Sequence, residues 1–507
     1  MVSAERLNAL PKLVAGQEWL RPYETTVMGS VDYRTWRERL NRVDELLRVS
    51  GAEEVVIRMV VARRQLEIKE AAAREGGPDP GMSEGAQVKL QRAISTAVRT
   101  TIGRSLKGCG YREFATYMAE SELMQRFCRI DRLGTVYVPS KSQLQRNAEM
   151  LEEGEIREVV DQLLKAAADG TSALRLKEAV DVKTWLVDST CVKLNIHYPT
   201  DWVLLRDAGR TLMKATMLIR GRGLKERMKE PSWFLGRMNG LAMEMGKQSR
   251  RAAGKKKERK KLLRKMKKLA KCMGGHAKRH RDLLEKEWEK TDLSQKEAAQ
   301  IIGRIDTMLE RLPEAIQQAH ERIIGERQVA NEEKILSLYE GHAAVYVRGK
   351  AGAEVEFGSQ LLIAETRSGV IADWELVCGN PEHDTALLER SLKRGASLGV
   401  KTVGGDRGFD SKKMRGILEE NKIENGIARR NGEEAKKKSK EPVYVELQKR
   451  RAQTEGRISI VKNYVGKPLL AKGHRNQARQ VAWSMLAHNL WVLAGLAEKE
   501  SAMAAAA

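Results

Sequence analysis

The chain has 507 residues, of which 41% are hydrophobic and 32% are charged, with 92 lysines and arginines against 68 acidic residues. This length exceeds what one hydrophobic core supports, so roughly two to four domains are expected, and the composition excludes a disordered chain. The net charge of +24 favours a polyanionic partner, most commonly nucleic acid. Ribosomal association and an acidic membrane surface are the alternatives.

Cysteine usage and hydropathy bear on the compartment. The five cysteines are scattered and form no C-x-x-C pair, which predicts reduced thiols in a cytoplasmic protein and no structural zinc site. The opening stretch MVSAERLNALPKL lacks the apolar core of a secretory signal. The apolar run at 481–496 contains His488 and Asn489 and is too short to cross a bilayer. We therefore expect a cytoplasmic protein that does not associate with a membrane.

Residues 1–180 are predicted to form an all-helical region for DNA binding and dimerisation. Apolar residues recur at helical spacing from Trp36 to Leu47, and the breaker GGPDPG marks a linker near 76–86. GYREFATYMAESELMQRFCRI is expected to form two short helices, and another helix is expected to start at Ser140. This helix–turn–helix pattern fits either a DNA-reading unit or a plain helical bundle. In a DNA-reading unit, exposed Lys141, Gln143 and Arg146 would contact the DNA.

Residues 201–342 are predicted to form a basic, coiled-coil-like helical insertion. The stretch 247–281 holds 17 lysines and arginines against one acid, which makes phosphate-backbone contact the favoured reading of this charge. Apolar residues spaced four and three apart between Leu262 and Met273 form a seam. A return helix from Ile301 to Leu312 is expected to pack on this seam as an antiparallel hairpin and to end at Pro313. The basic residues expected to contact DNA are Lys255, Lys256, Lys257, Lys260, Lys261 and Arg264.

Residues 181–200 and 343–500 are predicted to form one mixed α/β domain that the insertion interrupts. Strands are expected at TWLVDSTCVKLNIH, VEFGSQLLIAE, VIADWELVCG, KTVGGD and ENGIARR, because each mixes β-branched and apolar residues between turn signals. Helices are expected at HDTALLERSLKRG and SKKMRGILEEN, and a charged loop at 431–441 leads to two further helices. This order predicts a mixed sheet with helices against it.

Three acids stand in a context that fits either catalysis or ordinary surface charges. Asp188 and Asp406 each follow a short apolar run, as if delivered by buried strands, and Glu455 shares one helical face with Arg451 and Lys462. Carboxylates at such positions can hold two Mg²⁺ ions roughly 3.5–4 Å apart for phosphodiester cleavage or exchange. Asp188 suits the bridging position, and the cations suit phosphate.

Other acids and histidines are weaker candidates. His197 and Asp201 follow the first strand, and His383 and Asp384 precede the second acid, so each pair offers a metal ligand or a base. A helix cap for Asp384 and ordinary loop histidines are the favoured readings. Asp410 is likewise expected to cap the next helix.

The motifs LVDST, GDRGFDS and R-x3-E-x6-K, in this order, resemble the DDE transposases of bacterial insertion sequences, whose catalytic domain is RNase H-like. NIHYPTD, VRGKAGAEVEFGSQ and NPEHDTALLE resemble the ISNCY-type members, and the resemblance spans about residues 90–495. It implies that Asp188, Asp406 and Glu455 are the catalytic, metal-binding triad. The family signature Y-x2-R-x3-E-x6-K has a tyrosine where this chain has Gln448, which can hydrogen-bond a phosphate but cannot stack on a base.

The expected function is therefore metal-dependent cleavage at transposon ends and strand transfer into target DNA, as in DNA recombination. Arg451, Lys462 and Gln448 are expected near DNA, Mg²⁺ is the expected cofactor with Mn²⁺ as a substitute, and terminal inverted repeats and target DNA are the expected partners. Joining two ends makes a homodimer or larger assembly the expectation. A metal-dependent endonuclease without strand transfer and a non-catalytic DNA-binding derivative remain alternatives.

Overall fold

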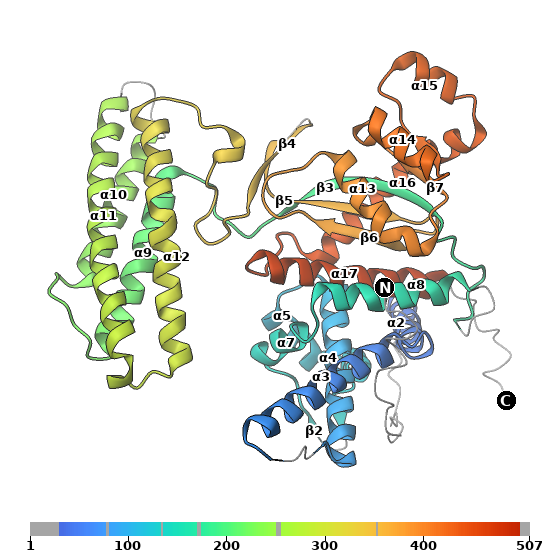
Figure 1. Cartoon of the computed structure of the whole chain (residues 1–507), viewed down its shortest axis with the longest axis horizontal. Coiled ribbons are helices and arrows are strands. Elements are labelled where there is room, and N and C mark those ends of the chain that lie inside the picture. Colours follow the sequence, from blue (N-terminus) through green and yellow to red (C-terminus); the bar gives the residue numbers. More distant parts are fainter. Residues whose placement is uncertain are drawn as a thin grey trace. The chain divides into compact units, whose positions relative to one another are not determined.

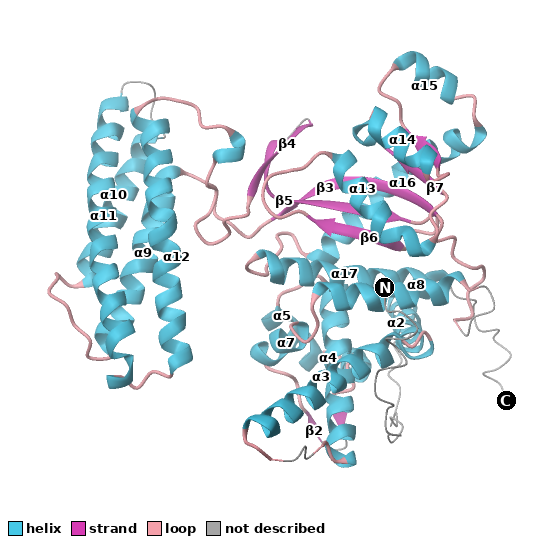
Figure 2. Cartoon of the chain, in the orientation of Figure 1, coloured by secondary structure: helices cyan, strands magenta, loops and turns pink. Residues whose placement is uncertain are grey.

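The computed structural model describes residues 30–77, 81–132, 135–169, 174–249, 255–350 and 353–496. The helices expected before residue 30 and the centre of the expected linker, 78–80, lie outside these ranges. The chain is mixed α/β with helices predominating, as Figure 2 shows. No helix within the described ranges combines the length and the hydropathy needed to cross a membrane.

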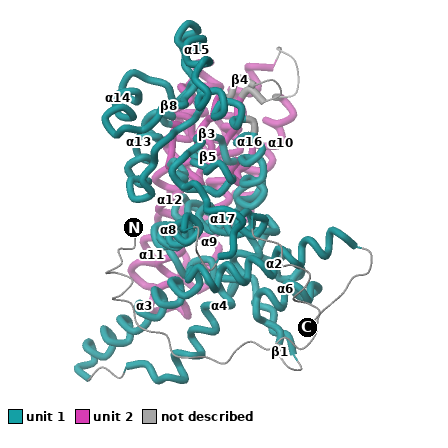
Figure 3. Tube along the Cα trace, turned by 90° about the vertical axis from the view of Figure 1, so that its right-hand side faces the viewer, with its two compact units in different colours: residues 1–192, 360–377, 382–507 teal, residues 193–359, 378–381 magenta. Residues whose placement is uncertain are grey.

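The chain divides into two compact units, which Figure 3 distinguishes by colour. The first contains residues 1–192, 360–377 and 382–507, and the second contains 193–359 and 378–381. The second unit thus includes the whole of the expected insertion together with residues on either side of it.

The first unit begins with a set of helices (Figure 1). As predicted, GYREFATYMAESELMQRFCRI forms two short helices, and Ser140 caps a third by accepting a hydrogen bond from the backbone N–H of Gln143 at 3.2 Å. A two-stranded ribbon, β1 (Asp131–Arg132) and β2 (Thr135–Val136), separates these helices where a simple turn was expected. The helices are α2 (Val31–Val49), α3 (Ala52–Arg74), α4 (Glu84–Lys107), α5 (Tyr111–Glu120), α6 (Glu122–Phe127), α7 (Lys141–Ala148) and α8 (Glu153–Ala168).

The sheet mixes parallel and antiparallel pairing. The strand order is β4–β5–β3–β7–β8, and β6 also pairs with β5. β3, β7 and β8 run parallel, whereas β5 is antiparallel to both β4 and β6. All five predicted strands are present, and β4 is an additional one. The strands are β3 (Thr184–Lys193), β4 (Ala344–Lys350), β5 (Ala353–Glu365), β6 (Ile371–Leu376), β7 (Thr402–Gly405) and β8 (Glu424–Ile427).

The later helices of the first unit follow the predicted order with one addition. A short helix, α15, occupies most of the expected charged loop, because Asn431 Oδ1 accepts the backbone N–H of Glu433 at 2.9 Å and so caps a helical turn. The other four match the predicted segments. These helices are α13 (Asp384–Arg394), α14 (Lys412–Glu420), α15 (Gly432–Lys438), α16 (Pro442–Val465) and α17 (His474–Leu496).

Helix α17 is the core element of the first unit. Nearly every residue from Gln477 to Leu493 is buried, and the helix packs against α2, α4, α8, α16 and β6. Its polar groups are bonded to the sheet: Asn489 exchanges hydrogen bonds with the backbone of Ile371, and His488 Nε2 lies 3.0 Å from the carbonyl of Gly369. Burial lowers the pKa of His488 to about 3, so this imidazole is neutral.

The second unit contains a four-helix bundle, at the left in Figure 1. The predicted packing of the basic helix against its return helix is confirmed, and the seam residues are buried or half-buried. The hairpin is, however, only half of the structure, since two preceding helices complete the core. The expected end at Pro313 was wrong: the return helix continues through this residue, which is exposed. The helices are α9 (Asp201–Gly221), α10 (Pro231–Ser249), α11 (Lys256–Glu287) and α12 (Gln295–Ala319).

Glycines in two strands allow α16 to approach the sheet closely. Leu447 of α16 is fully buried, and a Cβ at Gly426 of β8 would lie 2.3 Å from Leu447 Cδ1. A Cβ at Gly404 of β7 would lie 3.3 Å from Leu447 Cβ. The helix therefore sits directly on the two parallel strands, at a distance that larger residues in the strands would prevent.

We predict that Gly426→Ala lowers the free energy of unfolding by about 1–3 kcal/mol, because the added methyl group overpacks the contact with Leu447. Gly416→Ala is the control, since nothing lies within 4 Å of a Cβ at this position in α14 and alanine favours a helix. Urea denaturation of both variants measures the difference. Equal stability of Gly426→Ala and the unsubstituted protein would contradict the close packing.

Candidate active site

The register of two parallel strands places Asp188 next to Asp406. β3 pairs with β7 from Thr184↔Thr402 to Val187↔Gly405, so the next positions in the same register are the two aspartates. Neighbouring strands lie about 4.8 Å apart, and side chains at matched positions of parallel strands point to the same face. The predicted meeting of these two acids, in the middle of β3 and directly after β7, therefore follows from the pairing itself.

A third carboxylate, Asp384 at the start of α13, joins them. Its Oδ1 accepts hydrogen bonds from Ser189 Oγ at 2.7 Å and from Gln360 Nε2 at 3.2 Å. A Cβ built on Gly408 would lie 2.6 Å from Asp384 Oδ2 and 2.8 Å from Asp406 Oδ1, so both carboxylates face the same small space.

The reading of Asp384 as a helix cap was wrong. The N-cap residue of α13 is His383, which makes no side-chain capping bond, and Asp384 is bonded across the site instead. In the motif NPEHDTALLE an acid occupies the first helical position. This was the sequence signal that Asp384 could belong to the functional site.

The cluster carries negative charge that its surroundings do not fully compensate. Burial, followed by repulsion from Asp406 and Asp384, raises the pKa of Asp188 to about 6, against the opposing effects of the Ser189 N–H and of Arg451. Burial, followed by the charge of Asp406, also raises the pKa of Asp384, despite its hydrogen bonds from Ser189 and Gln360. Buried acids that repel one another favour protons or cations.

Helix α16 brings Arg451 to this cluster. Gln448 Nε2 donates to the carbonyl oxygens of Gly405 at 3.2 Å and Gly426 at 2.8 Å, which fixes the helix at the ends of β7 and β8. Arg451 follows Leu447 by one turn on the same face, and its charge acts on Asp188. In this structure the amide nitrogen of Gln448 is thus engaged with the sheet.

Glu455 lies one turn beyond Arg451 and is exposed, and Lys462 is half-buried in the last turn of α16. Within the described residues, no group of three or more His, Cys, Asp or Glu side chains is arranged to hold a metal ion. The structure therefore joins Asp188 with Asp406 and Asp384, and it does not preassemble the predicted triad as a metal site.

The donor set nevertheless fits divalent ions of the magnesium class. Such ions prefer carboxylate oxygens and retain several waters, so one or two acids are enough to anchor each ion. Asp188 and Asp406 offer these oxygens at adjacent positions, and the raised pKa of Asp188 reflects a charge that a cation would neutralise.

Two further acids have structural partners. Asp410 does not cap α14, a role taken by Ser411, and instead it pairs with Arg415 at 2.7 Å and Arg429 at 3.0 Å. Burial opposes ionisation of Asp410, but these arginines and the N–H of Arg430 lower its pKa to about 2. Asp201, at the start of α9, accepts hydrogen bonds from Gln318 and Arg322.

The predicted DNA-binding cations of the second unit differ in their surroundings. Lys256 and Lys260 pair with Glu326 at 2.9 and 2.8 Å, and Lys255 is half-buried. Lys257, Lys261 and Arg264 on α11 are exposed, as is Lys256.

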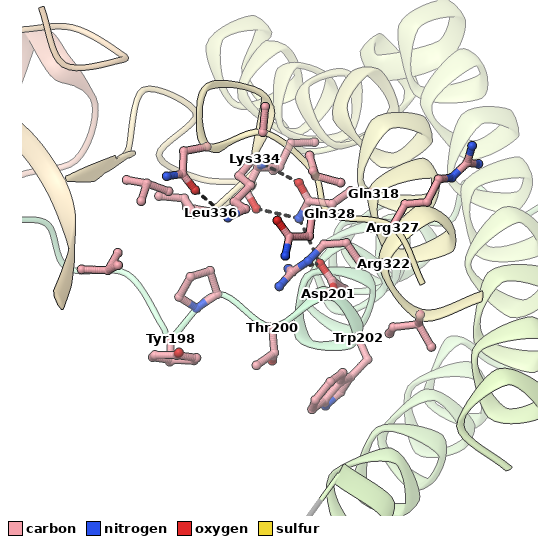
Figure 4. Close-up of a pocket in the computed structure, with 18 of the residues that line it drawn as sticks. Tyr198, Thr200, Asp201, Trp202, Gln318, Arg322, Arg327, Gln328, Lys334 and Leu336 are labelled. Atoms are coloured by element: carbon pink, nitrogen blue, oxygen red, sulfur yellow. Dashed lines mark hydrogen bonds and ion pairs between the residues drawn. The ribbon is translucent and has the colours of Figure 1, made fainter. Parts of the chain in front are cut away.

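A cavity of about 1070 Å³ lies beside this end of α11, within the second unit. In Figure 4, Tyr198, Thr200 and Trp202 follow one side, Lys334 and Leu336 lie opposite, and the Asp201–Arg322 pair lies between them. Both acids of this lining, Asp201 and Glu326, pair with cations, and three of its five cations, Lys256, Arg322 and Arg327, have carboxylate partners.

Comparisons with protein-family models, with curated proteins and with solved structures found no match to this chain.

We predict that Asp188→Asn raises the free energy of unfolding at pH 7 without metal by about 1–3 kcal/mol. The pKa of Asp188 is raised from 3.8 to about 6 on folding, so its protonated form favours the native state, and this contribution is lost as the pH rises from about 4 through 6. Urea denaturation in the presence of a chelator, between pH 4.5 and 7.5 (roughly the range of this titration), measures both effects.

Asp410→Asn is the matched control with the opposite sign, because the pKa of Asp410 is lowered to about 2 and its charge stabilises the fold at neutral pH. If Asp188→Asn destabilised the protein at pH 7 as Asp410→Asn is expected to, then Asp188 would be a compensated structural acid.

Proposed function

We propose that this protein is a DDE-type transposase whose mixed sheet is an RNase H-like catalytic domain. The observation that carries the proposal is the parallel register that sets Asp188 beside Asp406. Support for the fold assignment comes from the parallel β3–β7–β8 pairing, the antiparallel β5–β6 pairing, and the helical unit that lies between the two acids in the sequence.

In this proposal Asp188 and Asp406 anchor two Mg²⁺ ions, or Mn²⁺ in their place, and Glu455 completes the set when DNA is bound. The ions would supply the charge that activates an attacking oxygen and stabilises a leaving one. Arg451 holds the scissile phosphate, since it already acts on Asp188 from α16. Asp384 positions Ser189, the residue after Asp188, through the 2.7 Å hydrogen bond.

The partner in this proposal is DNA, first the terminal inverted repeats and then the target. The exposed cations of α11 provide a backbone contact that is insensitive to sequence, and the helices of the first unit provide recognition. Two ends must be held together for strand transfer, which requires at least a dimer. The protein would act at the nucleoid, in the cytoplasm.

Two other functions use the same residues. A metal-dependent endonuclease would cleave the ends without joining them to a target. A DNA-binding derivative without activity is disfavoured by the carboxylate cluster, since uncompensated buried acids have no use in a protein that only binds a polyanion.

We predict that, with Mg²⁺ or Mn²⁺, the protein cleaves DNA carrying the terminal repeats that flank its coding region and joins the 3′ ends to target DNA. Asp188→Ala, Asp406→Ala and Glu455→Ala are expected to lose this activity. Asp384→Asn is expected to lower it roughly 10–100-fold, because Asp384 positions Ser189 next to Asp188. Gel assays of cleavage and strand transfer measure both steps.

Asp282→Asn, at a half-buried position of α11 in the other compact unit, is the matched control and should keep full activity. Cleavage that survived in the three alanine variants would overturn the triad. Cleavage without joining would identify an endonuclease instead of a transposase.

A further inference from the structure

A second cavity, of about 270 Å³, lies among the helices of the first unit and is distinct from the carboxylate cluster. Its walls come from the last turn of α4, the first residues of α5, α7, the segment 470–472 and α17. One acid lines it, Glu149, which accepts a hydrogen bond from Gln145 at 2.9 Å. Four cationic residues line it, namely Arg104, Lys141, Lys472 and Arg479.

Arg104 is a buried cation without an anionic partner. Its side chain is 4% exposed, its Nη1 donates to the carbonyl of Cys109 at 3.3 Å, and its guanidinium lies 4.7 Å from the ring centre of Tyr111. Its Nε has no hydrogen-bond partner, and none of its contacts with the described residues involves a carboxylate. An uncompensated buried charge is costly, so this position calls for an anion.

Arg99, on the same helix, is an arginine whose charge is compensated by carboxylates. It is also fully buried, but it pairs with Asp44 at 2.8 Å and with Glu53. Arg479, 5% exposed, lines the cavity and pairs with Glu152 at 2.5 Å, although its Nε has no hydrogen-bond partner. Of these three buried arginines, Arg104 alone has no carboxylate partner among the described residues.

The backbone adds to this positive potential. Helix α5 begins at Tyr111 after the N-cap residue Gly110, which has no side chain to satisfy the first N–H groups, and both residues line the cavity. The free N–H groups and dipole of a helix N-terminus favour an anion. A buried guanidinium that has no carboxylate partner among the described residues and a helix N-terminus without a side-chain cap thus line the same cavity.

We propose that this cavity binds a phosphate group. Its volume suits one phosphate with a few waters, since a water occupies about 30 Å³ of liquid. Lys141 and Lys472, both exposed, would contact the outer oxygens, and Arg104 the inner ones. We take the source to be a DNA backbone phosphate, which would orient α7 with its exposed Gln143 and Arg146 towards the bases. This choice of source depends on the proposed function, whereas the phosphate site does not.

The first experiment compares the melting temperature of the full-length protein in sodium phosphate and in sodium chloride of equal ionic strength. Phosphate is expected to raise the melting temperature of the unsubstituted protein more than that of the double variant Lys141→Gln/Lys472→Gln. Lys89→Gln, an exposed lysine of α4 outside the cavity, is the control for charge and should respond fully. The general stabilising effect of phosphate is common to all variants and cancels in the comparison.

Arg104→Gln is expected to lose the phosphate response as well, and if this variant does not fold, the double variant of exposed lysines still decides the question. An equal response of the double variant and Lys89→Gln would overturn the phosphate site.

The second experiment measures duplex DNA binding by fluorescence anisotropy at several salt concentrations. Loss of one phosphate contact should reduce the slope of log K against log salt by about 0.9 in the double variant and not in Lys89→Gln. A phosphate response with unchanged DNA binding would overturn DNA as the source and identify free phosphate. A protein that binds phosphate here but cleaves no DNA would overturn only the proposed function.

Discussion

The parallel pairing of β3 with β7 is the constraint on which the candidate site depends. It makes Val187 and Gly405 neighbours, and the following residues, Asp188 and Asp406, then lie side by side although a whole helical unit separates them in the sequence. Two carboxylates placed in this way repel each other, and burial increases the effect. The repulsion between these carboxylates therefore destabilises the sheet where β3 meets β7, and a bound cation would relieve it.

Other parts of the first unit hold these two strands in place. Gly404 and Gly426 admit Leu447, and Gln448 binds the last carbonyl groups of the two strands, so that α16 carries Arg451 to the acids. On the other side, α17 is bonded through its buried polar residues to the start of β6. Apolar packing sets the distances, and a few polar contacts set the register.

The charged residues of this unit fall into two classes that the structure separates clearly. Arg99 and Asp410 are buried with partners of opposite charge, which marks them as structural. Arg104 is buried and Asp188 is half-buried, and neither has partners that balance its charge, so each lies where an external ion or phosphate would complete it. Residue type does not distinguish these classes, since each contains one arginine and one aspartate. The distinction is the local balance of charge.

Local patterns determined much of this protein from the sequence alone. β-Branched and apolar runs between turn signals predicted the five strands, and helical hydrophobic spacing predicted most helices. Apolar runs before Asp188 and Asp406 predicted that strands deliver both. Tertiary structure decided what spacing does not encode: the role of Asp384, the contacts of Gln448, the completion of the helical hairpin into a bundle, and the course of α12 through Pro313. The physical reason is that periodicity reflects which face of an element is buried, whereas the partner that buries it comes from distant segments, whose packing no local pattern records.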